Sequence, residues 1–172
     1  MNKVAKKITT AVLLMAMVLS AAACSKIQSK TTEQFKKAVI DSRIGAQTQD
    51  FTTTNGNGWN YIEFTMNDGS DIVVDSICWV FDDKAEAKSD YNEVYKYYMS
   101  LVETGVFSGS RNELDKGDYA YFTIKGTGDG QYIYGGWYYS GNSVVYVCTN
   151  TDSDDARTKV NKILDQLGYP KP

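Results

Sequence analysis

Few side chains in this sequence can form or break covalent bonds. Histidine is absent, which excludes Ser–His and Cys–His nucleophile pairs, histidine general bases and metal sites that need imidazole. Carboxylate, lysine and tyrosine chemistry remain open, and Glu63 and Asp75 are carboxylates that such chemistry could use. The sequence therefore points first to non-covalent binding and keeps a carboxylate-based enzyme as the alternative.

The first of three cysteines, Cys24, follows a segment with the order of a secretory signal. That segment contains a basic stretch, a short apolar run and small residues, namely Lys3, Lys6 and Lys7, then Ala11 to Leu19, then Ser20 to Ala23. The apolar run is about half the roughly 20 residues that a membrane span needs. The pattern resembles a bacterial lipoprotein signal with its lipobox, although Ala21 stands where leucine is usual.

This resemblance implies cleavage before Cys24 and acylation of its thiol with chains such as palmitate. Two acyl chains give stable anchoring, whereas one chain gives only marginal binding. The expected location is the extracytoplasmic face of the cell membrane. The alternative is ordinary cleavage near Ala23, which would release a secreted protein with a free thiol.

The other two cysteines, Cys78 and Cys148, lie in runs typical of strands. In an exported protein an even pair favours a disulfide, and two strands could bring these thiols together across a sheet. A loop of this length would stabilise the fold by roughly 4 kcal/mol in the chain-entropy model. Two separate buried thiols are the alternative.

Aromatic residues supply the strongest hint of a binding surface. The chain has 13 tyrosines and three tryptophans, and they are dense between Gln131 and Tyr139. Strand geometry places Tyr132, Tyr134 and Tyr138 on one face, with Tyr119 and Tyr121 as neighbours from another strand. Tyrosine combines an apolar ring with a polar hydroxyl, which suits recognition of glycans or proteins. Packing inside the sheet is the alternative for the same rings.

Hydrophobic periodicity and turn residues predict an α+β fold with a mainly antiparallel five-stranded sheet. In chain order we expect a helix from Thr31 or Thr32 to Gly45, strands Tyr61 to Met66 and Ile72 to Phe81, a helix from Asp82 or Asp83 to Gly105, strands Tyr119 to Ile124, Gln131 to Tyr139 and Ser143 to Thr149, and a helix from Asp152 or Ser153 to Gly168. The order is thus α-β-β-α-β-β-β-α. The polar stretch from Gln47 to Gly58 and the segment around Gly109 and Asn112 are interpreted as loops.

We expect three segments: a signal peptide over residues 1–23, a lipidated cysteine with a short tether over 24–30, and one domain over 31–172. Without the three lysines of the signal, 15 basic residues stand against 21 acidic ones, a net charge of −6. A protein with this negative charge binds nucleic acid weakly, so we expect no nucleic-acid partner. The acidic groups 67–71 and 152–155 fit turns and helix capping better than the EF-hand pattern, so we expect no metal and no cofactor.

Four short motifs of caps, turns and core positions occur along the chain: Thr31 to Phe35, Val80 to Asp83, Gly141 to Tyr146 and Leu167 to Tyr169. With these motifs the layout is similar to small lipoproteins of Gram-positive bacteria that carry no established activity. The resemblance implies a location and a fold but no site. Our functional expectation is a membrane-anchored binding module whose partner is a cell-wall glycan or a membrane protein. A carboxylate enzyme and an accessory subunit of a membrane complex are the alternatives.

Overall fold

The computed structural model describes residues 26–69, 71–128 and 130–172. The predicted signal segment and Cys24 lie outside this described part. Within it the elements are α2 (Thr32–Asp41), the 3₁₀ turn η2 (Thr48–Asp50), β1 (Phe51–Asn55), β2 (Trp59–Asp68), β3 (Asp71–Phe81), α3 (Lys84–Glu103), β4 (Phe107–Asp115), β5 (Tyr119–Gly128), β6 (Gln131–Ser140), β7 (Ser143–Thr149) and α4 (Asp154–Leu167). The fold class α+β is confirmed.

The predicted five strands and their order are wrong, because the antiparallel sheet has seven strands in the order β1-β2-β3-β7-β6-β5-β4. The two missed strands, β1 and β4, occupy the segments interpreted as loops. Both are edge strands, and most of their side chains are exposed. A strand that buries neither face does not need alternating apolar and polar residues, so its composition resembles that of a polar loop.

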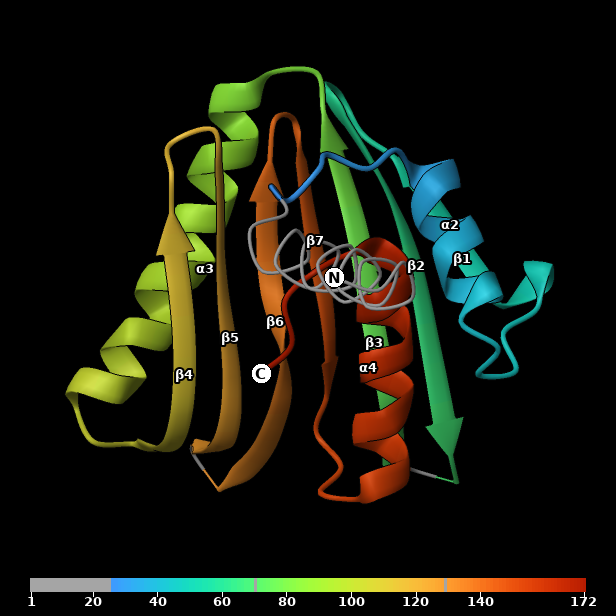
Figure 1. Ribbon diagram of the computed structural model, residues 1–172. Coiled ribbons are helices and arrows are strands. Elements are labelled where there is room, and N and C mark those ends of the chain that lie inside the picture. The colour runs from blue at the N-terminus through green and yellow to red at the C-terminus, as the bar shows by residue number, and fades with distance from the viewer. Residues whose placement is uncertain (1–25, 70, 129) are drawn as a thin grey trace, which may run out of the picture.

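The connections explain how two separate meanders form one sheet (Figure 1). Strands β1 to β3 form the first meander and β4 to β7 the second. Helix α3 carries the chain from β3 to the far edge at β4, and the second meander then returns until β7 pairs with β3. The last strand therefore lies at the centre of the sheet. Six of its seven residues are buried, and Tyr146 is half-buried.

The helices cover the two faces of the sheet unequally. Helices α2 and α4 pack on β2, β3 and β7, and we call this the α4 face. Helix α3 packs on the opposite face against β3, β4, β6 and β7, and we call this the α3 face. Figure 1 shows α2 and α4 over one side of the sheet and α3 over the other. Among the described residues, no helix packs closely on two diagonally opposed regions: β4–β5 on the α4 face and β1–β2 on the α3 face.

The helix starts and the end of α4 follow the predicted capping residues, whereas the predicted stop of the first helix at Gly45 is wrong, because α2 ends at Asp41 with Ser42 as its C-cap. Thr31 and Gln34 form a capping box before α2, with bonds of 3.0 and 3.2 Å. Ser153 accepts a bond from the Ala156 amide at the start of α4, and Gly168 ends that helix with a φ of 73°. Local sequence signals were sufficient here, since a cap satisfies amides within one turn of the helix.

The predicted disulfide is wrong, because Cys78 and Cys148 are both free. They lie on paired strands, but Cys78 stands opposite Val145 and Cys148 opposite Asp75. The offset of three residues is odd, so the two side chains point to opposite faces of the sheet. Cys78 belongs to the core of the α4 face and Cys148 to that of the α3 face. A disulfide cannot bridge through a sheet.

The part of the chain that the structure describes contains no helix whose length and apolar character would let it cross a membrane.

Candidate functional site

The five predicted patch tyrosines do share the α4 face, but two of them are core residues. Tyr134 and Tyr138 expose only 6% and 1% of their surface, so the prediction that they form an exposed patch is wrong. The Tyr134 hydroxyl donates to Asn161 Oδ1 at 2.9 Å, and the Tyr138 hydroxyl to the Pro170 carbonyl at 2.6 Å. These rings hold α4 and the C-terminal segment on β6, which is an internal role.

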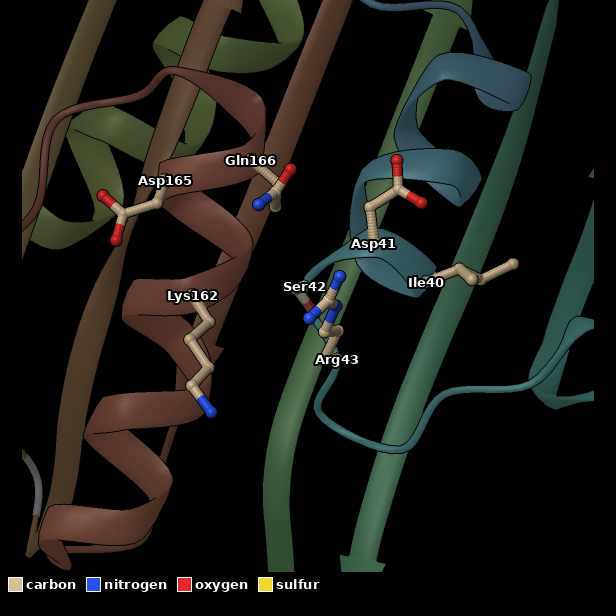
Figure 2. Close-up of a pocket in the computed structure, with 7 residues that line it drawn as sticks. All are labelled: Ile40, Asp41, Ser42, Arg43, Lys162, Asp165 and Gln166. Carbon is tan, nitrogen blue, oxygen red and sulfur yellow. The ribbon is translucent and has the colours of Figure 1, made fainter.

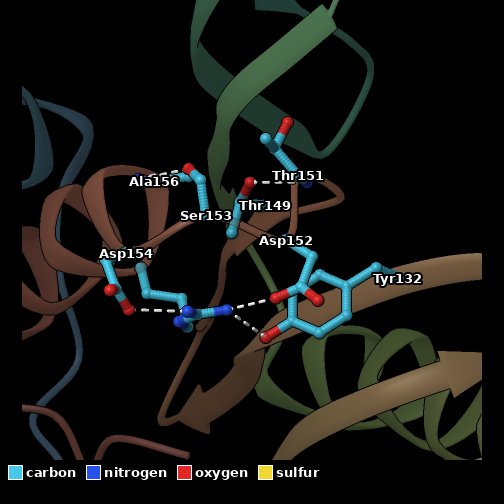
Figure 3. A network of polar contacts seen from close by, with 8 residues as sticks. Tyr132, Thr149, Thr151, Asp152, Ser153, Asp154 and Ala156 are labelled. Carbon is cyan, nitrogen blue, oxygen red and sulfur yellow. Dashed lines mark hydrogen bonds and ion pairs between the residues drawn. The ribbon is translucent and has the colours of Figure 1, made fainter.

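The third tyrosine of β6, Tyr132, belongs to the same attachment. Its hydroxyl accepts from Arg157 at 3.2 Å, and the Arg157 guanidinium lies over the ring, 6.0 Å from its centroid. The same guanidinium pairs with Asp152 through Nη1, beside Tyr132, and with Asp154 through Nη2 on its other side (Figure 3). The acidic group before α4 therefore orients an arginine.

Tyr119 and Tyr121 of β5 remain half-buried on the α4 face, in the region that none of the helices in the described part of the chain covers. Tyr121 stacks on Tyr138 with ring centroids 6.4 Å apart. The Lys26 ammonium lies 5.8 Å from the Tyr119 ring centroid. Of the predicted patch, these two rings and Tyr132 keep contact with solvent.

A second aromatic surface lies on the α3 face of β2 and β3, and the sequence pattern did not reveal it. Trp59 stacks on Tyr61 with centroids 5.7 Å apart and an interplanar angle of 10°. Tyr61 stands directly opposite Trp79, and their centroids are 6.2 Å apart. All three rings are half-buried. We call Trp59, Tyr61 and Trp79 the aromatic row.

The packing of Trp59 against the turn before it keeps the aromatic row in place. A Cβ atom on Gly56 would lie 2.1 Å from Trp59 Cε2, so the indole ring lies directly over the glycine. The Gly56 amide also donates to the Trp59 carbonyl at 2.8 Å. The ring is therefore held by the β1–β2 turn and is already positioned for contact with another molecule.

The two candidate carboxylates continue the same face beyond the aromatic row. Glu63 stands opposite Ile77, and Asp75 stands opposite Thr65, so the two acids are diagonal neighbours on the α3 face. Burial and the charge of Glu63 raise the pKa of Asp75, against weaker hydrogen bonds from Thr65 and the Ser76 backbone. Among the described residues, no ion pair includes either acid.

A small cavity adjoins Asp75 on this face, with a volume of about 140 Å³. Its polar walls include Asp75, Tyr98 of α3, and Tyr146 and Cys148 of β7. Burial raises the pKa of Tyr146 and of Cys148, so both groups stay protonated. The buried thiol is no nucleophile in this state. The cavity is smaller than the roughly 300 Å³ at which small-molecule sites begin.

Two larger hollows carry less chemistry. The groove between α2 and α4, of about 580 Å³, is lined by Ile40, Asp41, Ser42, Arg43, Lys162, Asp165 and Gln166. Asp41 pairs with Lys37 and Asp165 with Lys171, and Figure 2 shows Asp165 directed away from α2. The hollow between α3 and β4, of about 320 Å³, has its Glu113 held by the Tyr95 hydroxyl at 3.0 Å. Neither brings several functional groups to one point.

The sequence contained part of the signal for the aromatic row. Alternation along β2 places Tyr61 and Glu63 on one face, opposite the apolar Ile62. The aromatic density of β6 was the stronger pattern, however, and it reflects the docking of α4 on one face and of α3 on the other. Aromatic count alone does not separate core from surface.

Comparisons with known proteins place the chain in no family. No protein-family model and no curated protein matches it. Among solved structures it is similar to a GTP binding regulator, TM1622, from Thermotoga maritima, with 13% identity, coverage of 83% of this chain and 91% of that one, and a TM-score of 0.40. It is also similar to the extracellular domain of PknH from Mycobacterium tuberculosis, with 11% identity, coverage of 83% and 98%, and a TM-score of 0.39. At these scores neither likeness carries an argument about ligand or activity.

Proposed function

We propose that this chain is a lipid-anchored extracytoplasmic binding module, and that its ligand carries an ammonium or guanidinium group. The group would bind on the α3 face, between the aromatic row and the acids Glu63 and Asp75. The observation that carries this proposal is a pair of neighbouring carboxylates, without a cation partner among the described residues, beside three half-buried rings.

The charge balance of this face favours a cationic ligand. Asp75 is partly desolvated and is repelled by Glu63, and both effects raise its pKa. A bound cation would relieve the repulsion between the two acids and form charge-assisted hydrogen bonds with them. The rings add a second attraction, since a cation over an exposed aromatic face gains about 0.5–1 kcal/mol, and more when desolvated.

The size and position of the site favour one basic side chain of a protein partner. The cavity of about 140 Å³ beside Asp75 fits a single functional group better than a complete substrate. Strand β1, which pairs with the Glu63 strand β2, is an edge strand, and an extended peptide can pair with its free side. A lysine or arginine of such a segment would then reach the carboxylates. The partner is therefore a protein, which is one of the two partner classes expected from the sequence.

An enzyme is the second candidate, favoured by one observation: Asp75 has a raised pKa and lines a cavity. A raised carboxyl pKa is what general acid catalysis at neutral pH uses. Against it, Asp75 is the only carboxylate among the described residues that line this cavity, whereas hydrolysis of a glycosidic bond takes two. A binding function therefore uses the aromatic row and both carboxylates, whereas the enzyme hypothesis uses only Asp75 and its cavity.

A titration with a basic peptide tests the binding site. Purified full-length protein would be titrated with a lysine-rich hexapeptide and with the same peptide acetylated on every Nε, and the heat of binding measured. We expect only the cationic peptide to bind, and Glu63→Gln and Asp75→Asn each to weaken it about tenfold, which is 1.4 kcal/mol.

The matched control removes the same charge elsewhere. Glu33 is exposed on α2, across the sheet from the site, so Glu33→Gln should leave the affinity within about twofold. The site would be refuted if the acetylated peptide bound as tightly as the cationic one. It would also be refuted if Glu33→Gln weakened the affinity as much as Glu63→Gln does. Binding of a neutral oligosaccharide that Glu63→Gln does not change would assign the face to a glycan instead.

Metabolic labelling with a fatty acid tests the anchor separately. We expect label in the wild-type chain and none in Cys24→Ala. An unlabelled wild-type chain recovered with residues 1–23 intact would refute the anchor.

A further inference from the structure

The segment that precedes α2 is part of the folded domain. The sequence predicts a lipidated cysteine and a short tether over residues 24–30, but Ile27 is buried in the core of the α4 face with 1% exposure. Ser140 Oγ donates to the Ile27 carbonyl at 2.9 Å, and the Tyr169 hydroxyl to the Gln28 carbonyl at 2.8 Å. The Lys30 amide donates to Ser143 Oγ at 3.0 Å. From Ile27 onward the chain is fixed to the β6–β7 hairpin and to the C-terminal segment.

This attachment shortens the distance between domain and anchor. Three residue steps separate Cys24 from Ile27, and each spans at most about 3.3–3.6 Å, for a reach of about 10 Å. A free tether over the whole segment would allow about 20 Å. The headgroup zone on one side of a bilayer is about 5–8 Å thick. An acyl chain on Cys24 would therefore bring the surface around Ile27 to the lipid headgroups.

The surface next to this attachment has the composition of a membrane-contacting region. Tyr119 and Tyr121 lie there half-buried, Leu114 stands opposite Tyr121, and the Lys26 ammonium lies over the Tyr119 ring. Tyrosine rings favour the boundary between acyl chains and headgroups, and lysine reaches lipid phosphates. We call Lys26, Leu114, Tyr119 and Tyr121 the proximal surface.

Strands β4 and β5 direct their acidic side chains away from the proximal surface, and the nearest acid in sequence is the exposed Asp118 in the turn before Tyr119. Strand β5 contains no acid, and the two acids of β4, Glu113 and Asp115, stand opposite Phe122 and Ala120 on the α3 face. The proximal surface on β4 and β5 therefore presents no carboxylate to anionic headgroups, which would otherwise repel it.

Resting on the proposed anchor, we infer that the acylated protein lies on the bilayer with Lys26, Leu114, Tyr119 and Tyr121 in the headgroup region. Since the two faces of a sheet point in opposite directions, the aromatic row and the Glu63–Asp75 pair would then be turned away from the membrane. The anchor would thus orient the binding face toward a partner as well as retain the domain.

Depth-dependent quenching tests this orientation. Full-length protein acylated by a bacterial host would be reconstituted in vesicles of phosphatidylcholine and phosphatidylglycerol that contain nitroxide-labelled lipid. A fluorophore would be placed on Tyr121→Cys, on Leu114→Cys as a second proximal position, and on Thr52→Cys, an exposed position on the α3 face of β1. Cys78 and Cys148 are buried and would not react.

We expect both proximal labels to be quenched at least twofold more than the Thr52→Cys label. Equal quenching of the three labels, or stronger quenching at Thr52→Cys, would overturn the orientation. A chain that does not sediment with the vesicles would overturn it too, through loss of the anchor. Affinity for the basic peptide is measured separately on the same samples, so failure of the binding site is distinguishable from failure of the orientation.

Discussion

Tyr134 and Asn161 are joined by a hydrogen bond of 2.9 Å that holds α4 to β6. The bond belongs to a regular arrangement, because Tyr132 meets Arg157 and Tyr134 meets Asn161. Two strand residues span about 6.6 Å and four helix residues about 6.0 Å. The tyrosines of β6 and the polar side chains of α4 that they contact therefore have nearly the same spacing along the strand and the helix.

Removal of the Tyr134 hydroxyl should destabilise the fold by about 1 kcal/mol, since the partner amide loses its donor in a half-buried position. Chemical unfolding of Tyr134→Phe measures this change. A double-mutant cycle with Asn161→Ala should give a coupling energy of about 0.5–1 kcal/mol. Tyr97→Phe is the control, because this ring is 58% exposed. Additive effects of the two substitutions would show that the hydrogen bond contributes nothing.

Both cysteines of the domain should be reduced and inert in the native protein. Burial raises the pKa of Cys78 to about 12 and also that of Cys148 above its usual value. In the Cys24→Ala background, a thiol reagent at pH 8 should modify no cysteine before unfolding and two after it. A reductant should leave the melting temperature unchanged. If a reductant lowered the melting temperature and no free thiol were detected after unfolding without reductant, the two cysteines would form a disulfide after all.

Gly135 should tolerate no side chain, because the neighbouring strand approaches it too closely. A Cβ atom there would lie 2.2 Å from the Val147 carbonyl oxygen and 2.4 Å from Cys148 Sγ. Overpacking of this kind costs about 1–3 kcal/mol, so Gly135→Ala should lower the free energy of unfolding by at least that amount.

Gly117→Ala separates this clash from the cost of backbone strain. Gly117 has a φ of 81°, and a Cβ atom there would meet nothing within 4 Å, so only the backbone penalty of about 1 kcal/mol applies. Equal losses of stability in the two variants would mean that the sheet relaxes around residue 135 without cost.

The stability of the fold should depend on the charge of Asp75. Its pKa is raised in the folded state, so the folded protein holds this proton more tightly than the unfolded chain does. The favourable contribution is complete below the unfolded pKa of about 3.9 and is lost as pH rises through the folded pKa. Glu63, Tyr98, Tyr146 and Cys148 are the titratable groups that face this site.

Asp75→Asn should therefore melt above the wild type at pH 7, and the difference should shrink toward pH 4. Thermal unfolding followed by circular dichroism over this range measures it, with Glu33→Gln as the control for a change in net charge. A difference that grows on acidification would mean that the carboxylate is stabilised in the fold, contrary to the burial of Asp75.

Several features of the fold could be predicted because the interactions behind them are local. The Thr31–Gln34 box and the Ser153 cap act within one helical turn, and α3, α4 and the three strands β5 to β7 all appear near their predicted positions. The edge strands could not be predicted in this way. Their pairing depends on β2 and β5, which lie elsewhere in the chain, and their own side chains are mostly exposed.

By itself the sequence determined the α+β class, the helix caps and which residue types were available for chemistry. The tertiary structure alone decided how the strands pair and which part of each face a helix covers. The pairing of β2 with β3 shifts by one residue between Met66 and Asn67, and this shift places Trp79 opposite Tyr61. A shift of one residue moves every later side chain of a strand to the other face. Strand register and helix placement depend on contacts between distant segments, and for that reason they separated the two cysteines, buried Tyr134 and Tyr138, and left the aromatic row open.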